Sequence, residues 1–193
     1  MSDAEAPVRE SVLERTPDQI LGPFYPVGQT PDTTGDLTHG GKARGTILYL
    51  HGRILTTDGK PLAGARVEIW QANAKGRYGH PHEKDHAPVD PNFTGFSVQT
   101  TGADGKYAFK TIRPAAYPAA ADRWRPAHIH FSVTGKSEQI VTQMYFTGED
   151  WNDRDPWLNS ARRKDALITD PKPAQGKEPG ALDVEFDVVL AKG

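Results

Sequence analysis

The sequence has no cysteine among its 193 residues. This absence excludes disulfide bonds, thiolate metal ligands, iron–sulfur clusters and cysteine nucleophiles. Any metal ion must therefore be held by nitrogen and oxygen atoms. Long hydrophobic runs are missing too, and no window of the sequence is apolar over a length that could span a bilayer.

An excess of charge of one sign is also missing. The 23 Lys and Arg residues are balanced by 25 Asp and Glu residues, which gives a formal net charge of −2. This balance indicates neither a nucleic-acid-binding surface nor a polybasic membrane patch, so we expect neither kind of partner. Residues 1–20 are polar and acidic and lack the apolar segment of a signal peptide, which predicts a cytoplasmic protein.

Glycine and proline, in contrast, are plentiful, with 19 Gly and 16 Pro residues between short periodic segments. Segments with strand character recur along the chain, each bounded by turn residues. They cover residues 44–56, 65–70, 95–101, 107–112, 127–134, 140–146 and 182–190. Their number and spacing predict an all-β sandwich or barrel, and only residues 153–167 have a modest helical pattern.

The length fits one domain, which we place at residues 44–193 after an irregular arm at residues 1–43. Loops 71–94 and 113–126 are long for a compact domain. Long loops on a rigid β scaffold commonly carry function, so we expect the functional residues there. The polar stretch at residues 170–181, rich in Pro and Gly, predicts an exposed loop.

Two histidines, His128 and His130, alternate along one predicted strand. Side chains at i and i+2 of a strand lie on the same face, so both imidazoles would point the same way. Tyr78 and Tyr117 lie in the two long loops, and together with the histidines they would make a site of two nitrogens and two oxygens. Phenolates are hard anionic donors, so ferric iron is the natural candidate for such a site.

The residues alone leave other sites open. A cupin also uses His-x-His but needs a glutamate a few residues on, and the next one here is Glu138. An Fe(II) site of two histidines and one carboxylate would need an acidic residue, for which Asp122 and Asp150 are candidates without a recognisable pattern. The segment 51–117 is also typical of transthyretin-like sandwich domains, in which such tyrosines often serve only packing.

Three histidines, His80, His82 and His86, cluster in the polar part of loop 71–94. Because Glu83, Lys84 and Asp85 accompany them, we expect solvated loop residues rather than a second metal site. A single arginine, Arg125, stands three positions before His128, and its simplest role would be an ion pair with Asp122 or another surface carboxylate.

Three segments resemble the intradiol ring-cleavage dioxygenases. They are His51–Tyr78, Arg113-Pro-Ala-Ala-Tyr117-Pro and Trp124-Arg125-Pro-Ala-His128-Ile-His130-Phe. Two more, Val89-Asp-Pro-Asn-Phe-Thr-Gly and Thr142-Gln-Met-Tyr-Phe, most resemble the iron-bearing subunit of protocatechuate 3,4-dioxygenases. The resemblance covers about residues 20–190, with the motifs in the family's order.

This resemblance implies a two-sheet, transthyretin-like β-sandwich with long active-site loops. It also implies that Fe(III) is bound by Tyr78, Tyr117, His128 and His130. Tyr117 would be the axial ligand and would also accept a proton from the substrate. A position for hydroxide would remain on the ion.

The resemblance further implies a substrate pocket beside the metal. Arg125 would stabilise negative charge on the ring carbon that meets oxygen, and Gln143 would line the same pocket. Pro23 and Tyr25 belong to a segment that walls the substrate site in relatives. Ala119 stands where protocatechuate enzymes carry a tryptophan, which implies a roomier pocket.

The implied reaction cleaves a catecholic ring between its two hydroxyl-bearing carbons with O2 and gives a cis,cis-muconate. The partners would be a small aromatic diol and O2. Protocatechuate or another 4-substituted catechol is expected first, and catechol and hydroxyquinol are alternatives. A non-catalytic, transthyretin-like binding module is the alternative from another class. Whether the chain forms a homo-oligomer stays open.

Overall fold

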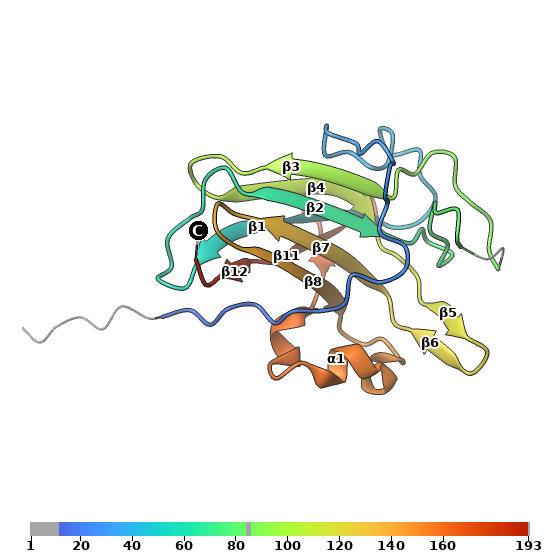
Figure 1. Cartoon of the computed structure of the whole chain (residues 1–193). Coiled ribbons are helices and arrows are strands. Elements are labelled where there is room, and N and C mark those ends of the chain that lie inside the picture. The colour runs from blue at the N-terminus through green and yellow to red at the C-terminus, as the bar shows by residue number, and fades with distance from the viewer. Residues whose placement is uncertain (1–11, 84–85, 193) are drawn as a thin grey trace, which may run out of the picture.

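The computed structural model of the chain describes residues 12–83 and 86–192. Residues 1–11 of the expected arm, together with Lys84 and Asp85 of the polar loop, lie outside this part. The described residues form two packed sheets and a projecting hairpin, seen from the side in Figure 1. No helix within these ranges is long and apolar enough to cross a membrane.

The first sheet is built around its longest strand, β1 (Ile47–Thr56). On one side β1 pairs antiparallel with β4 (Lys106–Ile112). On the other side it pairs parallel with β11 (Leu182–Glu185) and then with β12 (Val188–Leu190). The short β10 (Lys172–Pro173) pairs with β11 at the margin of this sheet, within the stretch predicted to be a loop.

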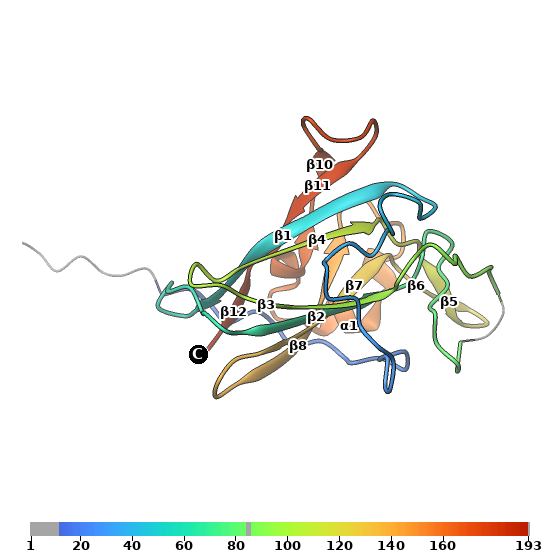
Figure 2. The same ribbon diagram turned by 90° about the horizontal axis from the view of Figure 1, so that it is seen from above.

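The second sheet has the order β3-β2-β7-β8-β9. Its strands are β3 (Phe96–Thr100), β2 (Arg66–Gln71), β7 (His128–Thr134), β8 (Gln139–Phe146) and β9 (Ile168–Thr169). Neighbouring strands are antiparallel except for β8 and β9. Figure 2 shows this layer beside the layer of β1 and β4, which confirms the predicted two-sheet sandwich.

The hydrophobic core lies between the two sheets and follows from strand alternation. Leu48 and Leu50 of β1 are at most 1% exposed, and Ile129, Phe131 and Val133 of β7 are fully buried. These residues recur at every second position, as one face of a pleated strand requires. The intervening residues of β7 therefore point to the outer face of the second sheet.

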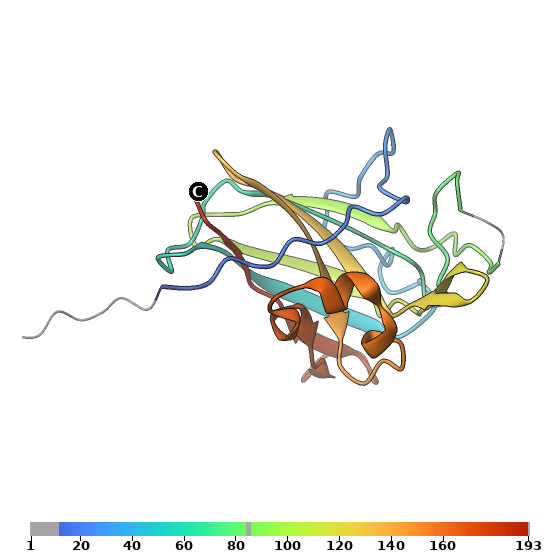
Figure 3. The same cartoon turned by 60° about the horizontal axis from the view of Figure 1, so that its bottom comes forward.

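The outer face of the second sheet is covered by the N-terminal segment, residues 12–26. Backbone N–H groups of this segment donate to both sheets: Thr16 to Val189 of β12, and Gln19 to Val141 of β8. Figure 3 shows the segment, in blue, crossing the strands on this side. Because of this cover, the outward residues of β7 are buried as well.

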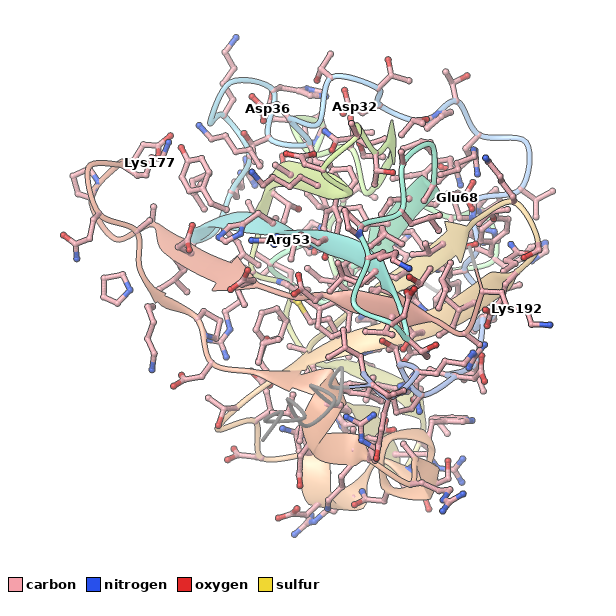
Figure 4. The ribbon with its side chains drawn as sticks, turned by 90° about the vertical axis from the view of Figure 1, so that its left-hand side faces the viewer. Asp32, Asp36, Arg53, Glu68, Lys177 and Lys192 are labelled. Carbon is pink, nitrogen blue, oxygen red and sulfur yellow. The ribbon has the colours of Figure 1, made fainter. Side chains whose placement is uncertain are left out.

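The chain then follows the open edge of the sandwich before it enters β1. Asp32 forms a bridge with Ser97 of β3, and Asp36 forms one with Lys110 of β4. Figure 4 shows both aspartates on this connection, above the strands that carry Arg53 and Glu68. The connection supplies backbone partners to two edge strands, one from each sheet, and so protects them from pairing with other chains.

Two elements differ in detail from the sequence prediction. Loop 113–126 contains a hairpin of β5 (Tyr117–Ala120) and β6 (Arg123–Arg125), which projects beyond the sheets in Figure 1. The helical pattern yields only short pieces: η1 (Asn152–Arg154), α1 (Pro156–Ser160) and η2 (Lys164–Leu167).

The predicted strand at residues 182–190 is interrupted between β11 and β12. The carbonyl oxygen of Phe186 approaches the backbone at Gly52 and accepts a hydrogen bond from the Tyr107 hydroxyl. The side chain of Asp187 accepts a hydrogen bond of 2.7 Å from the backbone N–H of Arg53. These contacts replace the regular ladder for two residues, and a hydrophobicity pattern does not reveal them.

Candidate metal centre and adjoining cavity

Two imidazoles stand side by side on the outer face of β7. His128 and His130 are each 2% exposed, and their Nε2 atoms lie 3.1 Å apart. On β8 their cross-strand neighbours are Tyr145 and Gln143. The indole of Trp70 on β2 stacks on His130, with centroids 4.7 Å apart and 9° between the planes. The i, i+2 spacing places both imidazoles on one face, as the sequence predicts.

Hydrogen bonding fixes the tautomer of His128. Its Nδ1 lies 2.7 Å from the carbonyl oxygen of Pro126, which can only accept, so Nδ1 donates and Nε2 carries the lone pair. Burial, and after it the charge of Arg125, lowers the pKa of His128 and of His130 well below the usual range. Both rings are therefore neutral. In metal-binding histidines, the ring nitrogen that does not bind the metal usually donates a hydrogen bond, often to a carbonyl oxygen, as Nδ1 of His128 does here.

Two phenols approach the imidazoles. The Tyr78 hydroxyl oxygen lies 3.2 Å from Nε2 of His130 and 3.4 Å from Nε2 of His128. Tyr117 opens β5, and its ring centroid lies 5.4 Å from that of Tyr78 and 5.8 Å from that of His128. The structure thus brings together the four residues that the sequence predicts as ligands.

Gly76 makes the meeting of the two tyrosines possible. The loop after β2 turns at Asn73, whose side-chain oxygen accepts two backbone N–H groups. Gly76 then adopts φ of +79°, and a Cβ at this position would lie 2.6 Å from the carbonyl oxygen of Ala116. Only glycine fits both the positive φ and this close approach. The loop therefore lies against the chain just before Tyr117, and Tyr78 follows two positions later.

Burial controls the protonation of the two phenols. It raises the pKa of Tyr78 well above the usual range, and the neighbouring Tyr117 raises it further. Burial also raises the pKa of Tyr117, while Arg125 acts in the opposite direction. Both phenols are thus protonated on their own, and a cation that bound them would have to displace their protons.

The donor atoms fit one metal ion. Ligands bound about 2.0–2.1 Å from a single ion are separated by about 2.9–3.4 Å at the usual coordination angles. The two Nε2 atoms and the Tyr78 oxygen show mutual distances of 3.1, 3.2 and 3.4 Å. Two neutral imidazoles with two phenols are a set of nitrogen and hard oxygen donors, which suits a hard cation such as Fe(III).

The described residues do not form the alternative site of two histidines and one carboxylate. Within residues 12–83 and 86–192, no three side chains of His, Asp or Glu gather in a way that could hold a metal ion. Asp122 and Asp150 are both exposed on the surface. The histidine pair of β7 therefore has phenols as its oxygen neighbours and not a carboxylate.

Arg125 of β6 is held rigidly beside this centre and is only 2% exposed. Its Nε donates to Asp155 at 2.7 Å, and one terminal nitrogen donates to Gln143 at 2.8 Å and to Tyr145 at 2.9 Å. Burial opposes the positive charge, but Tyr145 and the other anionic or phenolic neighbours outweigh it and raise the pKa of Arg125. The guanidinium therefore stays charged at any ordinary pH.

The partner of Arg125 is Asp155 and not the surface residue Asp122 that the sequence offers. Asp155 is fully buried and also caps α1, since its carboxylate accepts the backbone N–H of Leu158 at 2.8 Å. The Asp-Pro pair at positions 155 and 156 is a recognisable start of a helix. That signal could have marked the cap, but it says nothing of the arginine 30 positions earlier.

A cavity of about 640 Å³ opens beside Tyr117 and Arg125. Of the residues predicted to bind substrate, Pro23 and Ala119 lie in its wall. The wall also contains Trp157 of α1, which is not among the residues predicted from the sequence. The guanidinium carbon of Arg125 lies 4.5 Å from the centre of its ring.

The other two predicted substrate residues, Gln143 and Tyr25, are not among the residues that line this cavity. Gln143 is fully buried, accepts from Arg125 and donates to the carbonyl oxygen of Ile20 at 2.7 Å. The hydroxyl of Tyr25 donates to Glu68 at 3.0 Å, and its ring meets Trp70 edge-on at 5.0 Å. Glu68 in turn pairs with its strand neighbour Arg66. Gln143 therefore helps to hold Arg125 in the cavity wall, and Tyr25 packs against the indole that stacks on His130.

The polar loop contributes one side of the cavity. His82, Glu83 and His86 lie in its wall. The carboxylate of Glu83 lies 3.2 Å from Nδ1 of His86, and its side chain is only 4% exposed. His82 and His86 are exposed residues, as expected for solvated loop histidines, and the imidazole of His86 is in addition held by the loop, since its Nε2 lies 3.1 Å from the carbonyl oxygen of Gly76.

Comparison with known proteins places the chain in a family. A family model described as Dioxygenase matches residues 20–192. The protocatechuate 3,4-dioxygenase beta chain of Burkholderia cepacia is 41% identical over 165 residues, which are 82% of this chain and 70% of that protein. Catechol 1,2-dioxygenase 1 of Acinetobacter lwoffii is 36% identical over 210 residues, which are 94% of this chain and 63% of that protein.

A solved structure agrees in fold over a similar range. It is the dioxygenase domain of a dioxygenase carbohydrate-binding protein fusion from Streptomyces sp. SirexAA-E, with a TM-score of 0.72 and 28% identity. The alignment covers 93% of this chain and 100% of that one. The chain spans less than two thirds of the length of the catechol enzyme named above. It belongs to the intradiol ring-cleavage dioxygenases, a family of oxidoreductases.

Proposed function

We propose that the protein is an Fe(III)-dependent dioxygenase that uses O2 to cleave a catecholic ring between its two hydroxyl-bearing carbons, with a cis,cis-muconate as product. One observation carries this proposal. Two neutral imidazole nitrogens and a phenol oxygen lie within 3.4 Å of one another, next to a second phenol and a buried arginine. Family membership supports the same reaction.

Tyr78, Tyr117, His128 and His130 would hold the ion. When bound, Fe(III) in this ligand set would accept both oxygens of a catechol and make its ring reactive towards O2. Tyr117 lies in the wall of the cavity as well as beside Tyr78, so its oxygen, once a bound cation has displaced its proton, would be in a position to accept a proton from an arriving catechol.

Arg125 would stabilise the negative charge that develops on the substrate ring. Its side chain also lies in the cavity wall, and three hydrogen bonds hold it there before any substrate arrives. A cation fixed in advance in a buried place costs no reorganisation during the reaction. Its neighbours keep it charged, so its contribution would not depend on pH in the ordinary range.

The substrate would be a catechol with a substituent at position 4. The relatives bear the names of protocatechuate and catechol enzymes, so the comparisons support the catechol nucleus and leave the substituent to be determined. Protocatechuate, catechol and hydroxyquinol are therefore the first compounds to assay.

The test begins with the purified protein loaded with ferric iron. Phenolate-to-iron charge transfer should give a visible absorption band and a reddish-brown colour. Oxygen uptake with catechol should yield the ultraviolet spectrum of a muconate. A colourless, inactive protein after loading would refute the proposal, and semialdehyde products would show cleavage at a different bond.

The variant Tyr117→Phe tests the assignment of one ligand. Loss of one phenolate should shift and weaken the charge-transfer band and lower kcat by about a hundredfold or more, because proton transfer by a positioned group contributes about 10²–10⁴-fold. Tyr49→Phe makes the same change on β1, where the hydroxyl bonds Glu178 on the exposed side. Equal spectra for Tyr117→Phe and the wild type would contradict its role as a ligand.

A further inference from the structure

The cavity beside Tyr117 is much larger than a catechol ring. A cavity of roughly 150 Å³ is enough to take benzene, whereas this one has about 640 Å³. On the other side of Tyr78, next to Phe24 and Trp70, there is a space of only about 30 Å³, which is too small for a ring. A catechol that reaches Tyr117 therefore leaves most of the larger cavity for its substituent.

The wall facing this extra space is mainly apolar. Three successive alanines at the tip of the β5–β6 hairpin, residues 119–121, form one side. Ile20 and Pro23 of the N-terminal segment and the indole of Trp157 form others. Small and aromatic side chains together make a broad surface on which an apolar group can lose contact with water.

The charges of the wall do not suit an acidic substituent. Among the described residues of the wall, Arg125 is the one Lys or Arg, and its Nε already binds Asp155 at 2.7 Å. The buried carboxylate of Glu83 adds a negative charge on the side of the polar loop. His82 and His86 also lie in this wall, and the carboxylate of Glu83 already lies 3.2 Å from Nδ1 of His86. A carboxylate on the substrate would lose its water beside the Glu83 carboxylate and against a mainly apolar wall, which is unfavourable.

We propose that the natural substrate is a catechol with a bulky, uncharged and largely apolar substituent at position 4, which packs against residues 119–121 and Trp157. This inference rests on the proposed function, because it takes the catechol ring to bind at Tyr117. It names the substrate class by the chemistry of the cavity: an aryl, alkyl or ester-bearing side chain rather than a carboxylate.

A substrate panel tests the proposal on the iron-loaded protein. Catechol, protocatechuate, 4-tert-butylcatechol and 4-phenylcatechol differ only in the substituent. We expect kcat/KM for the two neutral, bulky compounds to exceed that for protocatechuate by about tenfold or more, the least effect expected of an unpaired buried charge. Protocatechuate as the preferred compound would overturn the inference.

Two substitutions at the hairpin tip sharpen this test. Ala120→Trp fills the space, so the ratio of kcat/KM for 4-phenylcatechol to that for catechol should fall by about tenfold. Ala120→Arg supplies a cation, so protocatechuate should gain relative to 4-phenylcatechol. Ala103 is an exposed alanine in the β3–β4 turn, at the opposite end of β4 from the hairpin. Ala103→Trp and Ala103→Arg are therefore matched controls that should leave both ratios unchanged.

Binding measured without turnover distinguishes a failure of the proposed reaction from a failure of the cavity assignment. Under anaerobic conditions, calorimetric titration with the same compounds reports affinity alone. If no catechol is turned over in air but the neutral, bulky compounds still bind more tightly than protocatechuate, the proposed reaction fails and the cavity assignment stands. If all four compounds are cleaved with equal kcat/KM and bind equally, the reaction stands and the cavity assignment is wrong.

Discussion

Gly22 lies directly against the imidazole of His130. A Cβ at this position would lie 3.1 Å from Cε1 of that ring, and the backbone has φ of +75°. Two separate costs would therefore accompany any larger residue: strain of the left-handed backbone and pressure on the ring. A second glycine six positions later, Gly28, has φ of +72° and no atom within 4 Å of a Cβ built at that position.

Gly22 and Gly28 give a matched test of how the imidazole of His130 is positioned. We expect Gly22→Ala to weaken iron binding by about tenfold, the lower end of the effect of residues that support metal ligands. Gly28→Ala bears the same backbone strain without touching a ligand, so its iron affinity should equal that of the wild type. Titration with ferric iron, followed by the visible band, measures both. Equal losses in the two variants would mean that backbone strain alone acts.

Asp155 offers a second test at the scale of one residue. It forms a fully buried ion pair with Arg125, and loss of one partner of such a pair leaves an uncompensated charge. We expect Asp155→Asn to lower the free energy of unfolding by about 3–5 kcal/mol, measured by urea denaturation. Asparagine is also a good N-cap, so the loss reports the ion pair and not the cap of α1.

The control for this variant lies two positions away. Asp153 is exposed at the start of the same helical region, and Asp153→Asn should change the free energy of unfolding by less than about 0.5 kcal/mol. If both variants unfold at the same urea concentration, the buried pair contributes no more than a surface charge.

The sequence predicts single residues well where local geometry decides. The period of the pleat is enough to put His128 and His130 on one face, and the flanking motifs identify Tyr78 and Tyr117. The partners behind them depend on tertiary packing. Asp155 and Trp157 contact Arg125 because α1 packs next to the β5–β6 hairpin. No sequence pattern in either segment predicts that the two elements lie together.

At the scale of elements, the N-terminal segment is fastened to the turn between β7 and β8. Arg15 donates to Glu138 at 2.6 Å, and Glu138 also accepts the backbone N–H of Lys192 at 2.9 Å. Burial alone would raise the pKa of Glu138, but the bond from Arg15 and the backbone bonds outweigh it and lower the pKa. This carboxylate thus links both ends of the described chain to one turn.

The direction of this shift sets the pH dependence. A carboxyl group whose pKa is lower in the folded state contributes stability above its unfolded pKa of about 4.3, and loses it as the pH falls through the folded value. Between about pH 6 and about pH 3, the wild type should therefore lose more free energy of unfolding than Glu138→Gln, by up to about 1 kcal/mol. Urea denaturation at each pH gives the difference, and parallel curves would contradict the role of Glu138.

Elements with regular alternation, such as β1, β4, β7 and β8, could be predicted within a few residues. The β5–β6 hairpin could not, because its tip is exposed and carries no alternating pattern. Its pairing follows from burial of Tyr117 and Arg125, which face each other in its register. The break between β11 and β12 likewise depends on Gly52 of another strand.

At the scale of the whole molecule, a bound ion would connect the sandwich to the β5–β6 hairpin, and these two parts differ in how many neighbouring strands stabilise them. β7 lies in the middle of a sheet, whereas β5 and β6, among the strands of the described residues, pair only with each other. An isolated two-stranded hairpin is at best marginally stable in water. Tyr117 would join this hairpin to the sandwich through the ion, so metal removal should loosen the hairpin before it affects the core.

Hydrogen exchange measured with and without ferric iron checks this expectation. Amides of residues 117–125 should exchange more slowly in the loaded protein, by about tenfold or more if the ion adds at least 1.4 kcal/mol of local stability. Amides of β1 and β4, which share seven register pairs, serve as the internal control and should not change. Equal slowing in both regions would mean that the ion stabilises the sandwich as a whole.

The N-terminal cover of the site has a consequence for the order of folding. Residues 16–20 are synthesised before β8 and β12, yet Ile20 accepts its hydrogen bond from Gln143, 123 positions later, and Thr16 binds Val189. Contacts so distant along the chain form late, because the intervening loop must first be ordered. These N-terminal contacts thus wait for β8 and β12, which are synthesised later, and closing the ligand site becomes one of the last steps of folding.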